Sequence, residues 1–139
     1  MGISEIRKKS NLFVANIEAN IETALMEKEQ AFTDINRMQM LAGKKSDDNA
    51  ILPKYSPAYA KKKGFTTPNL KLTGAFQGDM FFQTDGREFF VTSSDEKMEQ
   101  LTDRYGDMIF GIPKSRLKVA QELALGSLAR LYNRFVLND

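Results

Sequence analysis

Lysine side chains are concentrated in the middle of this 139-residue sequence, between Gly43 and Leu72. Seven lysines fall in that stretch against only Asp47 and Asp48, although the whole chain carries a net charge of +2. Clustered ammonium groups can neutralise DNA phosphates without reading sequence, can meet an acidic protein partner, or can simply be hydrated. We predict a partner or DNA contact at Lys44, Lys45, Lys54, Lys61, Lys62, Lys63 and Lys71.

Catalytic chemistry has few residues to draw on. The sequence has no cysteine and no histidine, which excludes disulfides, Cys/His zinc sites, thiol nucleophiles and histidine-based triads. Asp79, Asp85 and Glu88 straddle an expected turn without the spacing of a metal site. No Gly-Lys-Ser/Thr follows Gly74 and Gly78, so they form no phosphate loop. We predict a protein that is not an enzyme and holds no cofactor or metal; a carboxylate-dependent hydrolase is a rival interpretation.

Phenylalanines give the clearest strand signal. Residues 80–84 and 87–92 are two aromatic and β-branched runs, and the Asp85-Gly86 pair between them favours a type I′ hairpin turn. Successive side chains of a hairpin point to opposite faces, so one phenylalanine of each pair should be core and the other should face a second layer or a partner. Base stacking is the alternative role. We predict subunit packing by Phe81, Phe82, Phe89, Phe90 and Phe110.

A helix is expected at the start of the chain. Apolar residues from Ile3 to Leu25 recur mostly at spacings of three and four, and helix can continue to Met26 or beyond. Gly43 ends this segment. Residues 43–69 are predicted to form an extended basic loop, because breaks in regular structure recur at Pro53, Pro57, Gly64 and Pro68.

The end of the sequence predicts two more helices. A capping-box spelling at Ser93 and Glu96, with Ser94 and Asp95 as competing caps, should open a short helix that runs to Tyr105. Residues 108–112 are predicted as a third strand, and Pro113 suits the first turn of a last helix.

These elements define an α+β fold with an N-terminal helix, a long basic loop, a small antiparallel sheet with a β-hairpin and a short helix, and a C-terminal helix. We predict one domain, residues 1–139, with an N-terminal helical segment (1–42), the basic loop (43–69), and the sheet plus last helix (70–139). No apolar run approaches the ~20 residues that span a bilayer, so we expect no membrane contact. Two apolar hairpin faces would favour an oligomer.

Three short motifs carry a resemblance to a known family. Residues 55–61 read Tyr-Ser-Pro-Ala-Tyr-Ala-Lys, residues 70–76 read Leu-Lys-Leu-Thr-Gly-Ala-Phe, and residues 105–113 read Tyr-Gly-Asp-Met-Ile-Phe-Gly-Ile-Pro. Over about residues 36–120 this order resembles the phage virion-morphogenesis and tail-completion proteins, which are small neck proteins of tailed phages. The chain lacks the Trp/Pro-rich loop of some members.

The resemblance implies a structural role at the head–tail junction. Such proteins form homo-oligomeric rings that join the portal or adaptor to the tail and line the DNA path. The expected location is the neck or tail of the virion, and the host cytoplasm during assembly. The resemblance leaves open whether the chain is a tail-completion protein, a tail terminator or a head-side connector. The alternative is a small nucleic-acid-binding protein of a mobile element.

Overall fold

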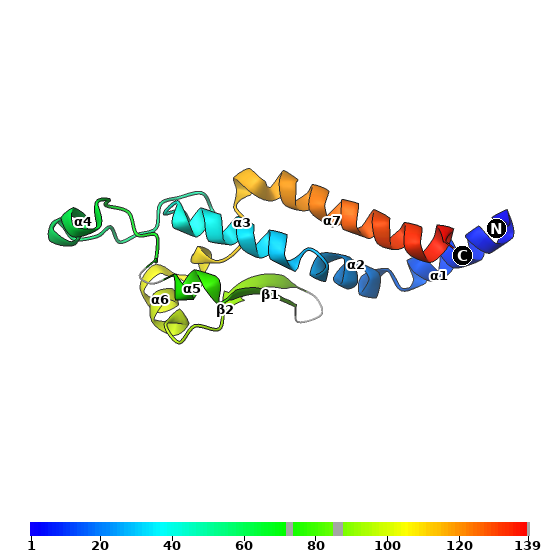
Figure 1. Ribbon diagram of the computed structural model, residues 1–139, viewed down its shortest axis with the longest axis horizontal. Coiled ribbons are helices and arrows are strands. Elements are labelled where there is room, and N and C mark those ends of the chain that lie inside the picture. The colour runs from blue at the N-terminus through cyan, green and yellow to red at the C-terminus, as the bar shows by residue number, and fades with distance from the viewer. Residues whose placement is uncertain (72–73, 85–87, 139) are drawn as a thin grey trace. The chain divides into compact units, whose positions relative to one another are not determined.

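A computed structural model describes residues 1–71, 74–84 and 88–138. Helices occupy both ends of the chain, and a two-stranded antiparallel sheet lies between them in the sequence (Figure 1). The predicted α+β class is therefore confirmed. None of the described helices combines the length and the apolar character that a bilayer crossing requires.

The chain divides into two compact units. The helical unit comprises Met1–Glu29 and Lys118–Asp139, and the hairpin unit comprises Gln30–Leu117. The sequence predicted a single domain for the whole chain; in the structure each unit has its own buried aromatic side chains, and each is described by itself.

The helical unit contains α1 (Ile3–Ala15), α2 (Ile17–Met26) and α7 (Leu117–Tyr132), which continues as a π-helical turn, η3 (Asn133–Leu137). The Phe13 ring is buried against the edge of Tyr132 at a centroid distance of 5.3 Å and lies 6.2 Å from Phe135. The helix predicted from Ile3 onward is interrupted at Asn16. Its side-chain amide donates to the Leu12 carbonyl, an alternative to the helical ladder that amide side chains offer.

A polar contact joins α2 to α7 inside this unit. The fully buried Ser127 hydroxyl donates to the Ala24 carbonyl at 2.6 Å. Beside it, the Glu27 carboxylate accepts from Arg134 at 2.6 Å and from Ser127 at 3.3 Å. These hydrogen bonds, that of Arg134 first, lower the pKa of Glu27. The contact supplements the apolar packing around Phe13.

The hairpin unit is built on α3 (Glu29–Leu41), β1 (Met80–Thr84) and β2 (Phe89–Ser93). The strands pair with Met80 opposite Ser93 and Phe82 opposite Val91, and these four side chains are buried on one face. From α3, the Phe32 ring stacks on Phe82 at 5.2 Å. The aromatic alternation therefore sets which face of the hairpin packs on α3. The predicted Asp85-Gly86 turn lies outside the described residues.

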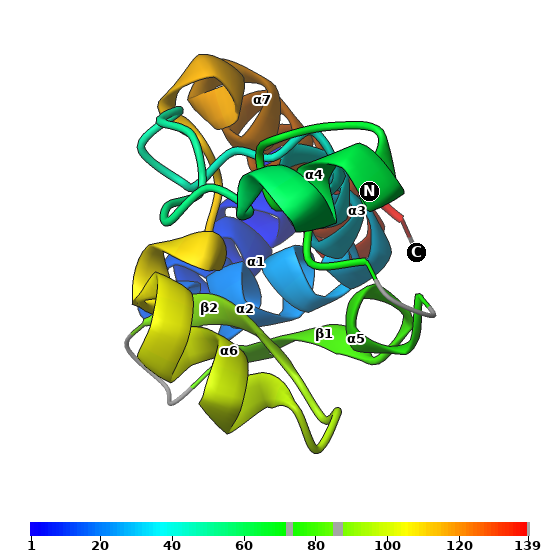
Figure 2. The same ribbon diagram turned by 90° about the vertical axis from the view of Figure 1, so that its left-hand side faces the viewer.

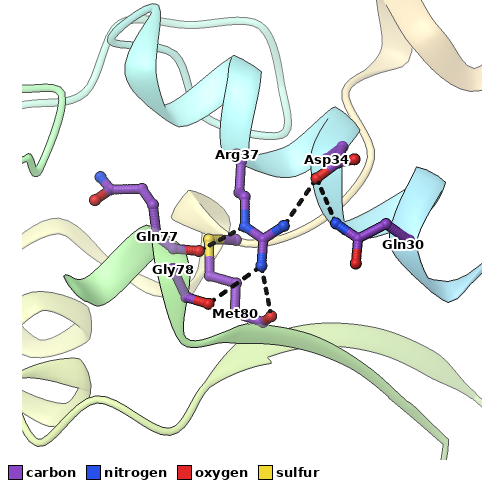
Figure 3. A network of polar contacts seen from close by, with 6 residues as sticks. All are labelled: Gln30, Asp34, Arg37, Gln77, Gly78 and Met80. Atoms are coloured by element: carbon purple, nitrogen blue, oxygen red, sulfur yellow. Dashed lines mark hydrogen bonds and ion pairs between the residues drawn. The ribbon is translucent and has the colours of Figure 1, made fainter. Parts of the chain in front are cut away.

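A single arginine of α3 binds the chain that leads into β1, at the end of the short helix α5 (Ala75–Gly78). The Arg37 guanidinium donates to the main-chain oxygens of Gln77, of Gly78 at 3.3 Å and of Met80 at 3.0 Å (Figure 3). Asp34, one turn earlier on α3, pairs with it at 2.8 Å. Arg37 thus fixes the start of the hairpin against α3.

The basic segment contains a helix where the sequence predicted an extended loop. In α4 (Pro57–Lys63) the Ser56 hydroxyl accepts from the Tyr59 amide at 3.3 Å, and Pro57 occupies the first turn. Gly64 ends the helix with φ +89°. The prolines and the glycine that indicated a loop instead bound this short helix, because proline suits a first turn and glycine suits the residue after the last turn.

The helix predicted after the hairpin is confirmed as α6 (Met98–Tyr105). The predicted capping box is wrong, because Ser93 ends β2 and its hydroxyl donates to the Phe76 carbonyl, while no side chain caps the helix at Lys97.

The predicted third strand is also wrong. Residues 107–109 form a 3₁₀ turn, η1 (Asp107–Ile109). The buried Asn36 side chain donates to the Ile109 carbonyl at 2.9 Å and accepts from the Gly111 amide at 3.0 Å. A side-chain amide therefore satisfies the backbone groups that a neighbouring strand would have bound. After Pro113, η2 (Lys114–Arg116) leads into α7.

Candidate functional site

A pocket of about 530 Å³ lies in the hairpin unit, where α4 and the residues before it face α6. Figure 2 views this unit from the side that carries α4 (green) and α6 (yellow). Apolar side chains of Leu70, Phe76 and Leu101 contribute to its wall. The chemically distinctive lining is four cationic side chains and three aromatic hydroxyls: Lys63, Lys71, Lys97, Arg104, Tyr55, Tyr59 and Tyr105.

Lys63 belongs to α4, Lys71 to the irregular residues after it, Lys97 is the N-cap of α6, and Arg104 lies in the last turn of α6. Lys63, in the last turn of α4, donates from its ammonium group to the Lys71 carbonyl at 2.8 Å and lies 5.9 Å from the centre of the Tyr59 ring. The spacing of seven residues between Lys97 and Arg104, about two helical turns, places both on the same side of the helix. Among the described residues, no carboxylate forms an ion pair with any of the four.

Two of the tyrosines are in ring contact with each other. The Tyr55 and Tyr59 rings meet edge to face at 4.8 Å, and Phe65 lies 6.0 Å from Tyr55. Burial raises the pKa of the Tyr55 hydroxyl, with smaller contributions from Tyr105 and Tyr59. Tyr55 therefore stays protonated at neutral pH and keeps a hydrogen-bond donor. The Arg104 guanidinium lies 5.5 Å from the Tyr105 ring centre, within cation–π range.

The structure brings only part of the predicted lysine cluster together. Lys63 and Lys71 line the pocket, whereas Lys45 pairs with Asp47 at 3.8 Å outside it. The remaining members of the cluster are exposed and line no part of the pocket: Lys44, Lys54, Lys61 and Lys62. Sequence reasoning missed Lys97 and Arg104. Their seven-residue spacing on a predicted helix was the available signal.

The predicted packing phenylalanines have different environments. Phe82 is buried between Phe32 and Phe89, whose ring lies 5.5 Å from it. Phe110 is half-buried, 5.8 Å from the Phe76 ring. Phe81 and Phe90 lie on the outer face of the hairpin. Phe81 is half-buried, and Phe90 is 41% exposed.

Acidic side chains in the described ranges do not gather into a metal site. The Asp47 carboxylate makes a local hydrogen bond, accepting from the backbone amide of Asn49 at 3.0 Å. Asp48 accepts from both the amide (3.0 Å) and the hydroxyl (2.6 Å) of Ser115. These two carboxylates therefore have structural partners rather than a shared pocket.

Comparison with protein-family models, with curated proteins and with solved structures finds no match for this chain. The family resemblance therefore stays a prediction from the three motifs. The first motif forms the start of α4, and the third covers the end of α6 and η1. In the second, residues 72–73 lie outside the described part of the chain.

Proposed function

We propose that this chain is a structural subunit of a phage virion ring at the head–tail junction, joining the portal or adaptor to the tail. The proposed family rests on the three sequence motifs. The proposed ring rests on one structural observation, which is that the two units leave large apolar side chains exposed to solvent. The pocket described above has no part in this proposal.

On the hairpin unit the apolar surface is the outer face of the sheet. The register places Phe81 opposite Thr92 and Phe90 opposite Gln83, so the two rings are diagonal neighbours on one face. On the opposite face Phe82 and Val91 are buried, and the Phe82 ring stacks on Phe32 of α3. A neighbouring copy that covers Phe81 and Phe90 would remove apolar area from water without disturbing the core.

The helical unit also leaves large apolar side chains exposed. Ile3 is 80% exposed and Leu125 is 66% exposed. Large exposed apolar surfaces mark interaction sites, and two different surfaces suit head-to-tail contacts that close by rotation into a ring. Others on this unit are Leu12, Val14, Phe135 and Leu137.

The exposed lysines of α4 fit the DNA path of such a ring. Lys61 and Lys62 are exposed and make no ion pair with a described carboxylate. Contacts of this kind with phosphates are non-specific and weaken with salt, which suits a channel that must release DNA. Replacing both by Gln should reduce DNA retention in assembled particles while the ring still forms.

The proposal is tested by the assembly state of the purified full chain. We expect closed rings in negative-stain electron micrographs and a matching mass by light scattering. A gold-labelled antibody to the protein should mark the neck of tailed-phage particles made by the cell that encodes it. A chain that stays monomeric at high concentration, with no label on particles, would refute the proposal.

The pocket favours one other function, a small nucleic-acid-binding protein of a mobile element. Its four cations would contact phosphates on a monomeric protein. Gel shifts at two salt concentrations, combined with the mass measurement, separate the two functions. A monomer that binds DNA strongly at low salt supports the second, and a ring with weak DNA binding supports the first.

A further inference from the structure

We infer that the pocket between α4 and α6 binds a nucleotide unit, with its phosphate held by the lysines and arginine and its base placed against the tyrosines. The inference goes beyond the proposed function, because ring formation depends on the exposed apolar faces and not on this pocket.

The charge of the pocket calls for an anion. Lys63 of α4 and Lys71 line it, as do Lys97, the N-cap of α6, and Arg104, in the last turn of α6. Among the described residues, no carboxylate lines the pocket. Asp103 of α6 lines an adjacent groove, which Arg104 also lines. Like charges that converge in a concave site repel one another, and this repulsion is relieved when an anion binds.

Arginine and lysine differ in how they hold a phosphate. The planar Arg104 guanidinium offers paired N–H donors to two phosphate oxygens. The ammonium groups act as point charges, and Lys63 is already oriented by its bond to the Lys71 carbonyl. The protonated Tyr55 hydroxyl adds a neutral donor. The site therefore offers donors rather than acceptors to its ligand.

The size and the rings of the pocket indicate more than a bare phosphate. A volume of about 530 Å³ lies within the range typical of small-molecule sites. Tyr55, Tyr59 and Tyr105 are among the lining residues, and a nucleic-acid base stacks favourably on a tyrosine ring. A ligand that carries both a phosphate and a flat ring matches the two halves of the lining.

A nucleotide unit fits this lining better than an acidic peptide does. A peptide carboxylate would use the cations but would leave the tyrosines of the lining unused. A base in duplex DNA is stacked inside the helix and cannot reach the tyrosines. The ligand is therefore an unpaired nucleotide unit, either free or within a single strand.

Isothermal titration calorimetry of the full chain tests this inference directly. The probes are thymidine 5′-monophosphate, thymidine, inorganic phosphate, a single-stranded octathymidylate, a G/C-rich hairpin duplex that stays paired at the assay temperature, and a capped Asp-Asp-Tyr peptide. We expect the monophosphate to bind more tightly than phosphate or thymidine alone, and the duplex to bind more weakly than the single strand. Tighter binding of the octamer than of the monophosphate indicates a strand as the source, and equal binding indicates a free nucleotide; both support the site.

Substitutions at the pocket locate the binding. Lys63→Gln and Arg104→Gln should each weaken binding of the monophosphate by about tenfold, the loss typical of one charge-assisted hydrogen bond. Arg116→Gln and Lys118→Gln remove matched charges at exposed positions outside the pocket and should change binding less than twofold. If Lys63→Gln fails to fold, the exposed Arg104 provides the decisive variant.

Three results would overturn the inference: no heat with the monophosphate, unchanged affinity in both pocket variants, or tighter binding of the peptide than of the nucleotide. Its failure is distinguishable from failure of the proposed function. If the protein forms rings that do not bind the monophosphate, only this inference is wrong. If the protein is a monomer that binds the monophosphate, only the proposed ring is wrong.

Discussion

The side-chain amide of Asn36 lies 2.9 Å from the carbonyl oxygen of Ile109, although 73 residues separate the two in the sequence. Both residues are fully buried. Asn36 also accepts from the Gly111 amide at 3.0 Å, so one side chain of α3 satisfies two groups of an irregular segment. Asn36 therefore ties the stretch between α6 and α7 to α3, together with Gln39, whose amide donates to the same Ile109 carbonyl at 3.4 Å.

Replacing Asn36 by Ala should destabilise the protein by about 2–4 kcal/mol. The change removes the partner of the Gly111 amide and one donor to the buried Ile109 carbonyl, and each buried group left unsatisfied costs about 1–3 kcal/mol. Urea unfolding followed by circular dichroism measures the loss. Asn11→Ala, on the exposed side of α1, is the control and should stay within about 0.5 kcal/mol. Equal stability of the two variants would contradict this role of Asn36.

Two glycines with positive φ should respond differently to alanine. Gly43 (φ +77°) has no room for a Cβ, which would lie 2.9 Å from Thr67 Cγ2 and 3.3 Å from the Pro68 carbonyl. Gly64 (φ +89°) faces open space. Both alanines incur the left-handed conformation, about 1–2 kcal/mol. We expect Gly43→Ala to lose about 1–3 kcal/mol more, because its neighbours are overpacked. Thermal unfolding of the two variants compares them, and a larger loss at Gly64 would count against this packing.

Acid should weaken the link between Asp48 and Ser115. The hydrogen bonds from the Ser115 hydroxyl, first, and from its amide lower the pKa of Asp48 below its ordinary value of 3.8. Because the folded pKa is the lower one, the stabilisation is present above the ordinary value and is lost as the pH falls through the folded pKa. Asp48→Asn should therefore melt below the wild type at neutral pH, and the two melting curves should converge in acid.

The hydroxyl of Ser115 provides an internal check on that pH dependence. Ser115→Ala removes the largest cause of the lowered pKa, so its melting temperature should fall less steeply with acid than that of the wild type. If Asp48→Asn and the wild type show the same difference at every pH, the carboxylate charge is not the source of the stabilisation.

Phe90 and Phe82 lie on opposite faces of the hairpin and should separate assembly from folding. Phe82→Ala removes a buried ring and should cost about 3–5 kcal/mol of stability. Phe90→Ala should cost about 1 kcal/mol or less, since the ring is 41% exposed, but should shift the assembly toward monomers. Light scattering and urea unfolding measure the two effects. Intact rings in Phe90→Ala would exclude this face from the subunit contact.

Short-range sequence patterns predicted the hairpin and the helix that follows it. The aromatic run predicted strand β1, and the residues between Ser93 and Tyr105 predicted helix α6. The third strand was wrong because its apolar run packs without a partner strand, and a distant side chain, Asn36, takes its hydrogen bonds. No spacing within residues 108–112 carries that information.

The candidate site was predictable only in part for the same reason. Lys63 and Lys71 belong to a lysine cluster that is evident in the sequence. The helix that carries Lys63 is not, because its flanking proline and glycine also predict a loop: both residues occur as helix caps and as helix breaks. Lys97 and Arg104 come from α6, more than twenty residues further along. Their meeting with α4 is a property of tertiary packing.

The guanidinium of Arg37 binds only main-chain oxygens at the entrance to β1. Those oxygens are present whatever side chains the residues carry. Sequence drift at Gln77 and Gly78 can therefore leave this attachment intact, whereas no other side chain supplies the same forked set of donors at residue 37. Among diverged copies of this chain, an arginine at this position should outlast the residues that it holds.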